Sequence, residues 1–144
     1  MKNEKHLIVK RSTLPGSGKG LFTKCLIPKD SMVTEYKGKI TTWENADHDN
    51  GENPYIYYVN KNHVIDAKNN NASLAHYAND ADGLKKVKQV GNNSAYTVEN
   101  KRVFIKAITD IPAGSEILVG YGKEYWDVIK KNKEPKRKRS SLKK

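Results

Sequence analysis

Short apolar and β-branched runs, separated by turns rich in Gly, Pro, Asn and Asp, make up most of the chain. Such a pattern predicts a mainly β protein with little helix and no βαβ rhythm. Hairpins are expected within 55–67 and within 94–108, the second turning near Asn100. Helical potential is confined to one short turn within 72–78 and to 123–131. About eight short strands are predicted, at 6–11, 20–25, 32–36, 39–41, 55–59, 62–67, 94–99 and 101–108, with a further strand-like run at 116–119.

The stretch EILVGYGKEYW, residues 116–126, ends its strand-like run at a tyrosine between two glycines, Tyr121. Glycines let the backbone approach other segments closely, so the phenol can be aimed at one point. A second aromatic pair, Tyr125 and Trp126, follows within one turn. The pattern fits a site tyrosine at a strand end, or a tyrosine that covers the core at a sheet corner.

The chain has 144 residues, which is enough for one domain with one core. Its two Trp and eight Tyr argue against disorder, so one folded domain is predicted. A single cysteine, Cys25, excludes a disulfide framework and a thiol zinc cluster, and its place in an apolar strand predicts a buried, inert thiol. The four histidines lack metal-ligand spacing, so no metal site is predicted. No apolar run reaches the ~20 residues of a membrane span, and the N-terminus lacks the apolar core of a signal peptide. A reducing compartment is expected.

Charge is unevenly placed along the chain, whose net charge is +11. Residues 127–144 hold nine Lys/Arg and two acidic residues, whereas residues 1–126 hold eighteen and fourteen. The tail, with PKRKRSS, resembles a nuclear localisation or DNA-backbone segment; a disordered solubilising tail is the alternative. The loop 43–54 is acidic, through Glu44, Asp47, Asp49 and Glu52. It is either a landing site for a cationic segment or a solvated loop.

The glycine-rich loop LPGSGKGLF, residues 14–22, can offer backbone N–H groups to a ligand. It matches neither familiar phosphate motif. A Walker loop would need Gly at position 13 and Ser or Thr at position 20, where the chain has Thr13 and Gly20. The dinucleotide fingerprint would need Gly at position 21, where the chain has Leu21. The loop therefore binds another kind of ligand or is a flexible turn.

Four pieces in order resemble the SET-domain protein lysine methyltransferases: GKGLF at 18–22, EYKG at 35–38, NHVIDA with SLAHYAND in 62–80, and EILVGYG at 116–122. NNSAY at 92–96 and IKAITDIPAGSEI at 105–117 fit the same order. The resemblance covers roughly 6–126 and is closest to minimal SET proteins that lack cysteine-rich flanking modules. It implies a SET-domain (β-clip) fold of small sheets around a pseudoknot, with a short C-terminal helix. Residues 1–126 would form the SET domain, and 127–144 the helix end and basic tail.

The resemblance also implies methyl transfer from S-adenosylmethionine to a protein lysine, without a metal. Tyr121 matches the family's essential tyrosine, and Tyr36 matches a channel position. Tyr57 and Tyr58 are expected to pack in the sheet, and Asp66 to be structural. The residues expected to bind the cofactor are Ser17, Gly18, Lys19, Gly20, Tyr55, Asn79, Asp80 and Trp126; for Trp126, core packing is the alternative.

Three positions depart from the family pattern. Asp80 stands where many members have His, so hydrogen bonding to the cofactor must differ there. His76 stands where many have Arg. Val119 stands where some have Tyr or Phe, which leaves room for a methylated amine and favours more than one methyl.

Partners and location follow from the same features. The expected substrate is a basic protein segment such as a histone tail, and the basic tail is expected to contact nucleic acid non-specifically. A homodimer is left open. The expected location is nuclear (the host nucleus for a viral or bacterial source) or cytoplasmic. The alternatives are a non-catalytic SET-fold binding module and a small basic nucleic-acid-binding protein.

Overall fold

Eight short strands and two single turns of 3-10 helix form the part of the chain that the computed structural model describes, which is residues 3–48, 53, 55–68, 73–82 and 91–120. The turns are η1 (Glu4–His6) and η3 (Ala75–Tyr77). The strands are β1 (Leu7–Arg11), β2 (Lys19–Thr23), β3 (Met32–Tyr36), β4 (Lys39–Thr41), β5 (Ile56–Asn60), β6 (His63–Asp66), β7 (Ser94–Glu99) and β8 (Arg102–Ala107).

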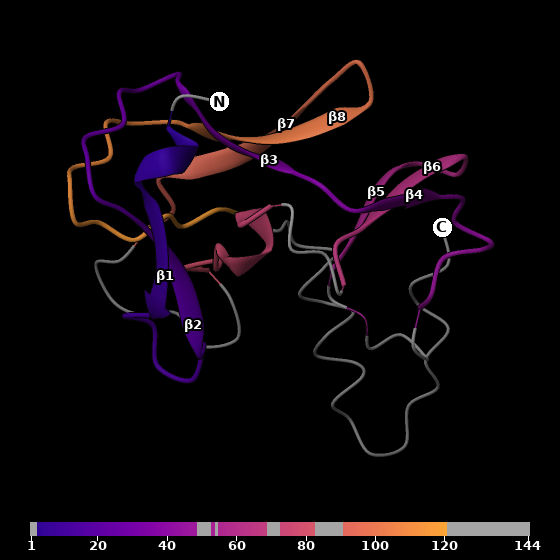
Figure 1. Cartoon of the computed structure of the whole chain (residues 1–144), viewed down its shortest axis with the longest axis horizontal. Helices are drawn as coiled ribbons and strands as arrows, with labels where there is room; N and C mark the ends of the chain where they lie inside the picture. The colour runs from indigo at the N-terminus through magenta and orange to yellow at the C-terminus, as the bar shows by residue number, and fades with distance from the viewer. Residues whose placement is uncertain (1–2, 49–52, 54, 69–72, 83–90, 121–144) are drawn as a thin grey trace.

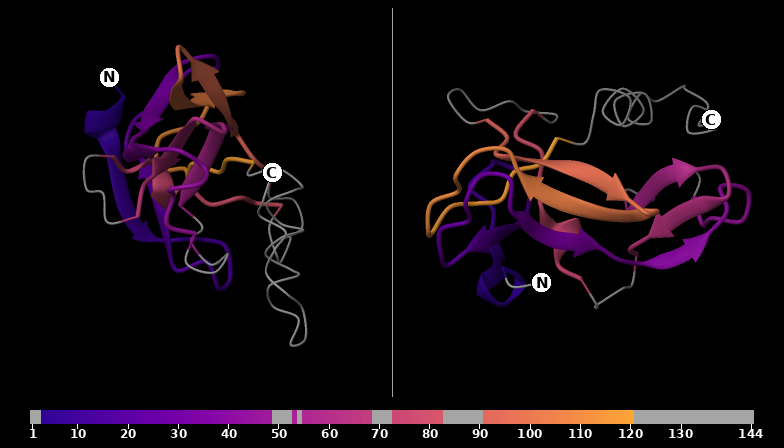
Figure 2. Two further views of the ribbon diagram at one scale, coloured as in Figure 1. Left: turned by 90° about the vertical axis from the view of Figure 1, so that its right-hand side faces the viewer. Right: turned by 90° about the horizontal axis from the view of Figure 1, so that it is seen from above.

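The strands form three small antiparallel sheets. The hairpin β1–β2 lies at one end of the molecule and the sheet β4–β6–β5 at the other (Figures 1 and 2). The sheet β3–β8–β7 lies between them, and the chain passes from its strand β3 directly into β4 (Figure 1). The two predicted hairpins are confirmed as β5–β6 and β7–β8.

Turn chemistry accounts for much of this layout. The β7–β8 turn has two residues with positive φ, Asn100 (52°) and Lys101 (64°). A two-residue turn of this kind matches the twist of the two strands that it joins. Two turns that begin with Ile-Pro, IPKD at 27–30 and IPAG at 111–114 (the IPxx turns), are built alike. In each, the N–H of a serine donates to a proline carbonyl three residues earlier, at 3.1 Å for both Ser31 and Ser115. Reciprocal backbone hydrogen bonds of 2.9 and 2.8 Å between Ile27 and Ile111 join the two turns.

One main core draws on all three sheets. Its fully buried side chains include Leu21 from β2, Val33 from β3 and Ile105 from β8. Ile117 and Val119 join them from the segment that follows the second IPxx turn. This burial holds three otherwise small sheets together, because none of them has enough apolar area to be stable alone. Within the described residues, no helix is long and apolar enough to cross a membrane.

Two sequence predictions need correction. The strand predicted at 20–25 ends at Thr23, whose side-chain hydroxyl donates to the carbonyl oxygen of Cys25 (2.7 Å) and turns the chain out of the sheet. Cys25 is therefore exposed rather than buried. The run 116–119 forms only single bridges to its neighbours, not a continuous ladder. The helix predicted at 123–131 and the basic tail lie outside the described residues.

Candidate functional site

Three segments far apart in sequence meet at Asn79. Its side-chain amide donates to the carbonyl oxygen of Lys19 (3.0 Å), at the start of β2. Its backbone carbonyl accepts from the N–H of Val119 (2.8 Å), and the two chains run parallel there. The glycine-rich loop, the SLAHYAND segment and the EILVG segment thus share one junction, as the resemblance predicts.

The segment 116–119 is enclosed on its other sides as well. The side chain of Asn93 accepts from the N–H of Leu118 (2.9 Å) and donates to the carbonyl of Glu116 (2.8 Å). Ser94 donates to the carbonyl of Leu118 through both its N–H (3.1 Å) and its hydroxyl (2.8 Å). The N–H of Ile117 donates to the carbonyl of Leu21 (2.7 Å). The segment therefore runs between β2, the residues around Asn79 and the start of β7. Gly120, which follows it directly, is left with little freedom.

The carboxylate of Glu116 fastens the glycine-rich loop to this junction. It accepts hydrogen bonds from the hydroxyl of Ser12 (2.7 Å) and from both the N–H (2.9 Å) and the hydroxyl (2.6 Å) of Thr13. Asn79 makes a longer contact with it, at 3.4 Å. Glu116 is buried, and a buried carboxylate is tolerated only when donors surround it. Glu116 was not predicted as a site residue, although a charged residue before an apolar run was a usable signal.

The glycines of the loop have two different roles. Gly18 has a φ of +65°, which favours glycine, and open space lies where a Cβ would be. Gly20 is buried, and a Cβ there would collide with the Glu116 side chain. Gly20 is thus required by packing at the junction, while Gly18 leaves the loop backbone accessible to a ligand. Ser17 is half-buried in the same turn, where its N–H donates to the carbonyl of Leu14 (3.2 Å).

Asp80 is turned toward the chain rather than outward. Its Oδ1 accepts from the N–H of Asp82 (2.8 Å) and from the side-chain amide of Asn92 (2.9 Å), and Asn92 in turn accepts from the N–H of Ala81 (2.8 Å). The carboxylate is buried and shapes the turn that follows Asn79.

A cluster of three tyrosines lies next to the junction. The rings of Tyr36, Tyr57 and Tyr96 are mutual neighbours, with centroid distances of 5.9, 6.0 and 5.0 Å and tilted or edge-on packing. Tyr96 follows Ser94 by two residues on β7, so both side chains lie on the same face of the sheet. Ser94 is bridged to Val119, so the 116–119 segment meets β7 two residues before Tyr96.

Tyr36 is held firmly, and Tyr57 stays neutral. The hydroxyl of Tyr36 donates to the carbonyl of Tyr55 (2.6 Å), and its ring is buried. Burial raises the pKa of Tyr57, so its phenol does not ionise near neutral pH. Tyr96 was not predicted from the sequence as a site residue, and Tyr57 was expected to pack in the sheet. The alternation of Ser94 and Tyr96 along one strand was the available signal for Tyr96.

Tyr55 lies at the margin of this region, with 37% of its surface exposed. Its ring meets His76 edge-on, with centroids 5.6 Å apart. Burial lowers the pKa of His76, so the imidazole is neutral where many relatives carry a permanent cation. The Nδ1 atom of His76 is buried and has no hydrogen-bond partner among the residues described.

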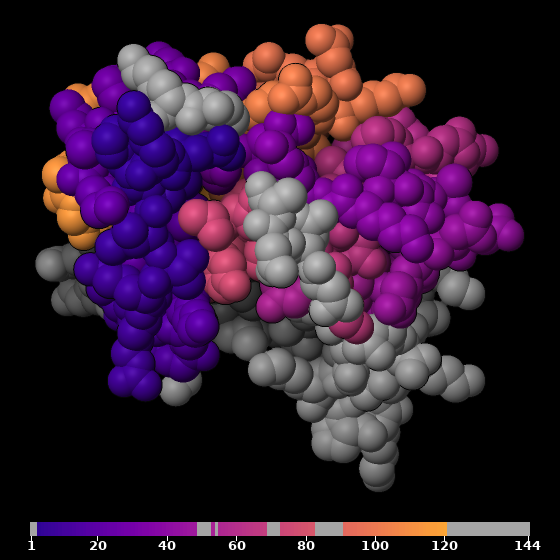
Figure 3. Space-filling view, in the orientation of Figure 1, coloured from indigo at the N-terminus to yellow at the C-terminus, as the bar shows by residue number. Residues whose placement is uncertain are grey.

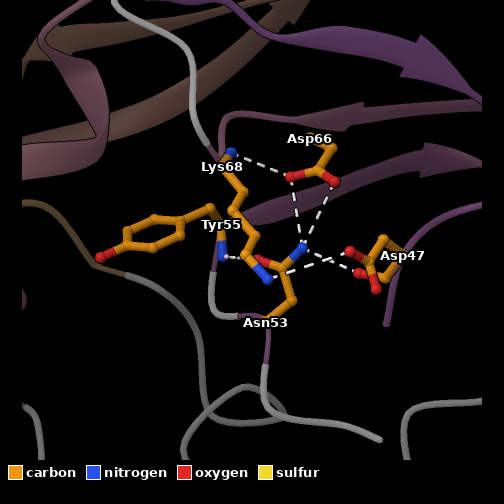
Figure 4. A network of polar contacts seen from close by, with 5 residues as sticks. All are labelled: Asp47, Asn53, Tyr55, Asp66 and Lys68. Carbon is orange, nitrogen blue, oxygen red and sulfur yellow. Dashed lines mark hydrogen bonds and ion pairs between the residues drawn. The ribbon is translucent and has the colours of Figure 1, made fainter. Parts of the chain in front are cut away.

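Behind Tyr55, a polar network fixes the loop that precedes β5 (Figure 4). The side-chain amide of Asn53 donates to both carboxylate oxygens of Asp66 (3.3 Å each) and to the carbonyl of Asp47 (2.8 Å), while its oxygen accepts from the N–H of Tyr55 (3.0 Å). The backbone N–H of Lys68 donates to the carboxylate of Asp66 (2.9 Å), and its side-chain ammonium forms a loose ion pair with Asp47 (3.9 Å). Asp66 is buried here, in agreement with the structural role expected for it.

The structure thus brings together most of the candidate residues. Lys19, Gly20 and Asn79 meet directly, Gly18 and Ser17 continue the loop, and Tyr36 touches Tyr55. Tyr121 and Trp126 lie outside the described residues, as do Asp49 and Glu52 of the acidic loop. No three His, Cys, Asp or Glu side chains in the described part of the chain are grouped to hold a metal ion.

The residues at the junction fit S-adenosylmethionine in donor and acceptor type. The open backbone at Gly16 and Gly18 would allow close approach. The amide oxygen of Asn79 is an acceptor beside that backbone, since its nitrogen is the atom turned to Lys19 and Glu116. Acceptors of this kind suit a ligand that carries amino groups and a positively charged sulfur.

Comparison with known proteins agrees with this arrangement. The family model of the SET domain matches residues 18–122, which include the second half of the glycine-rich loop, the Asn79 segment and the stretch through Gly120. No curated protein matches the chain. The small antiparallel sheets and the enclosed 116–119 segment are those of the SET fold. Because the match spans most of the chain and includes every segment of the junction, the protein belongs to the SET-domain family.

Proposed function

We propose that the chain transfers a methyl group from S-adenosylmethionine to a lysine of a basic protein segment such as a histone tail. SET-domain proteins are generally lysine methyltransferases, and this gives the reaction class. The observation that carries the proposal for this chain is the junction itself, where Lys19, Asn79 and Val119 meet by hydrogen bonds of 2.8–3.0 Å. The tyrosine cluster adjoins it through Ser94.

The tyrosine cluster suits an amine that must lose its proton before it reacts. A free lysine has a pKa of about 10.4, so it is almost wholly charged at neutral pH. Removal from water beside the packed rings of Tyr36, Tyr57 and Tyr96 would disfavour that charge. The raised pKa of Tyr57 works in the same direction, because a neutral phenol brings no anion that would stabilise the ammonium.

When bound, the cofactor supplies an electrophilic methyl carbon, which the lysine nitrogen takes up as the carbon–sulfur bond breaks. The chain's own part is to position the amine, and positioning contributes a large share of the rate in such a displacement. Tyr121 is proposed to orient the amine and methyl group, with Tyr36 as a channel wall. Aromatic walls also accept methylated amines by cation–π attraction, which supports transfer of more than one methyl.

The decisive experiment measures transfer of labelled methyl to a panel of histones and to free histone-tail peptides. The variants are Tyr121→Phe and Asn79→Ala, with Tyr58→Phe as the matched control. Tyr58 is part exposed and meets Trp43 edge-on, away from the cluster. We expect Tyr121→Phe to lose at least about 100-fold in rate while still binding cofactor, since oriented catalytic groups contribute this much. Asn79→Ala should lose cofactor binding as well.

Three outcomes separate the alternatives. Labelling that falls with Tyr121→Phe but not with Tyr58→Phe supports the proposal, and mass spectrometry of the product then gives the number of methyl groups. Cofactor binding without transfer to any protein supports a non-catalytic SET-fold module. Absence of both, in a chain shown to be folded by circular dichroism, refutes the proposed reaction.

Location and assembly remain part of the proposal. The basic residues of 127–144 support a nuclear location, and chromatin is the setting in which a histone tail would be met. Fluorescence microscopy of the tagged full chain, with and without the PKRKR sequence, tests this. A homodimer is checked by light scattering across a concentration series.

A further inference from the structure

The positive charge of the folded part is concentrated in hairpin β1–β2 and the residues that flank it. Residues 5–29 contain six Lys/Arg and no Asp/Glu. Residues 30–120 contain ten Lys/Arg and twelve Asp/Glu, so they are slightly acidic. The excess is therefore not a general property of the surface. The residues that carry it, here called the hairpin surface, are Lys5, Lys10, Arg11, Lys19, Lys24 and Lys29.

All six side chains of the hairpin surface are exposed, and none forms an ion pair with another described residue. The nearby carboxylates are already engaged: Glu116 is buried among Ser12 and Thr13, and Glu4 accepts from the hydroxyl of Thr34 (2.6 Å). By contrast, Arg102 at the far end of β8 has a carboxylate partner, Glu35, at 2.7 Å. Cations on the hairpin surface are thus left uncompensated.

The register of the hairpin spreads the charges along its length and over both of its faces, because Lys10 and Arg11 are successive residues of one strand. Lys24 lies at one end, where its N–H donates to the carbonyl of His6 (2.8 Å) next to Lys5. Lys10 pairs with Gly20 near the other end, and Arg11 lies directly opposite Lys19. Like charges directly opposite each other destabilise a hairpin. This arrangement costs folding stability, and an anionic partner would offset that cost.

The surface offers cations without exposed aromatic rings. Phe22, the aromatic ring of the hairpin, is 4% exposed and lies under the ammonium of Lys10 at 4.5 Å. Proteins that hold single strands stack bases on exposed aromatic rings, whereas contacts to a duplex backbone come from Arg, Lys and other polar groups and need no aromatic stacking. Hairpin β1–β2 also stands at one side of the molecule, open to an extended partner (Figure 3).

We propose that the hairpin surface docks the phosphate backbone of duplex DNA. Duplex DNA carries one negative charge per ~1.7 Å of axis, and the five residues of β1 extend over about 17 Å, so several phosphates face the hairpin at once. The inference stands apart from the proposed methyl transfer. It also assigns the folded domain a DNA contact of its own, in addition to the one expected of the basic tail. Lys19 belongs both to the hairpin surface and to the junction at Asn79. A protein bound to the same DNA would therefore lie close to the candidate site.

The test compares two variants of the full chain that lose the same charge. The hairpin variant is Lys5→Gln, Lys10→Gln, Arg11→Gln and Lys24→Gln, which spares Lys19 at the candidate site. The control is Lys37→Gln, Lys39→Gln, Lys61→Gln and Lys101→Gln, four exposed lysines elsewhere on the domain. Binding to a fluorescent ~20-bp duplex is measured by anisotropy at several salt concentrations, which gives the salt slope and the number of phosphate contacts.

The salt slope should fall by about 3 in the hairpin variant and by less than about 1 in the control, with Kd at ~100 mM NaCl raised at least about tenfold in the hairpin variant alone. Replacing Lys5, Lys10 and Lys24 by Arg should retain binding. Equal losses in the two Gln variants would mean that net charge alone sets affinity, and would overturn the proposal. Tighter binding to a single strand of the same sequence, or equal competition by polyglutamate, would overturn the assignment to duplex DNA. Matching melting temperatures confirm that both variants are folded.

Discussion

The hydroxyl of Tyr36 is fixed by a hydrogen bond to the carbonyl of Tyr55 (2.6 Å), and that carbonyl also accepts the N–H of Ala67 (3.0 Å). Tyr36→Phe therefore leaves the carbonyl bonded. We expect a loss of about 1 kcal/mol in the free energy of unfolding, measured by urea titration, which is typical of one buried hydrogen bond. Tyr58→Phe, at an exposed ring, should change it by less than about 0.5 kcal/mol.

Tyr36→Phe also tests whether Tyr36 lines the substrate channel or only packs in the sheet. If the hydroxyl helps to orient the substrate amine, the rate of methyl transfer per folded molecule should fall several-fold. An unchanged rate in a fully folded sample would assign Tyr36 to packing alone.

His76 predicts a pH dependence of stability. Burial lowers its pKa in the folded state, whereas the unfolded chain has a His pKa of about 6.5. The unfolded state therefore binds the proton first as pH falls. The contribution of His76 to stability is complete above about pH 6.5 and declines as pH falls below it toward the folded-state pKa.

His76→Phe keeps an aromatic ring against Tyr55 and Tyr77 and removes the titration. Urea unfolding of both proteins between about pH 7.5 and 5 gives a difference curve that isolates His76 from the other histidines. We expect the variant to gain stability relative to the parent as pH falls. A flat difference curve would show that His76 is not desolvated as described.

At the scale of elements, Gly38 shows how closely the sheet β4–β6–β5 is joined to β3. A Cβ at Gly38 would lie 2.8 Å from the N–H nitrogen of Ala67 and closer still to the carbonyl group of Asp66. These are backbone atoms next to the Lys39–Asp66 pair, so they cannot move without breaking the β4–β6 pairing.

Gly38→Ala should therefore lower the free energy of unfolding by about 2 kcal/mol, as overpacking of a rigid site does. Gly91→Ala is the matched control, because nothing lies within 4 Å of a Cβ there. Chemical denaturation of both variants provides the comparison. Equal, small losses in the two would contradict the close approach at Gly38.

Elements were also the level at which the sequence was most informative. Asn100 between two β-rich runs identified the β7–β8 hairpin, and the paired IPxx motifs identified two similar turns. The end of β2 was misplaced, because the local pattern continues to Cys25 while the Thr23 side chain bends the backbone away. The run 116–119 has strand composition, yet its bridges go to three different segments, which no local pattern records.

For the whole molecule, two basic regions are separated in sequence: the hairpin surface and the tail. Deleting residues 131–144 removes eight Lys/Arg. The affinity for duplex DNA should fall but remain measurable, since the hairpin surface is unchanged. The salt slope of binding should become smaller by several units. Methyl transfer to a free histone peptide should stay within about twofold, because general charge affects association more than chemistry.

Anisotropy with duplex DNA and a labelled-methyl assay, run on the same preparation, test both parts of this prediction. Complete loss of DNA binding on deletion would assign all of the contact to the tail. Loss of peptide methylation would instead show that the C-terminal segment takes part in the reaction.

The sequence by itself determined the β-rich class, the turns and the family, because these depend on local backbone preferences and on ordered short motifs such as GKGLF, NHVIDA and EILVGYG. The family resemblance also predicted Asn79 and the glycine-rich loop as parts of one site, and a hydrogen bond from Asn79 to Lys19 joins them. Only the tertiary structure decided that Glu116 fastens that loop, that Tyr96 joins Tyr36 and Tyr57, and that Asp80 serves a turn. These are contacts between residues that are distant in sequence or turned by packing, and their geometry is set when the three sheets close around one core.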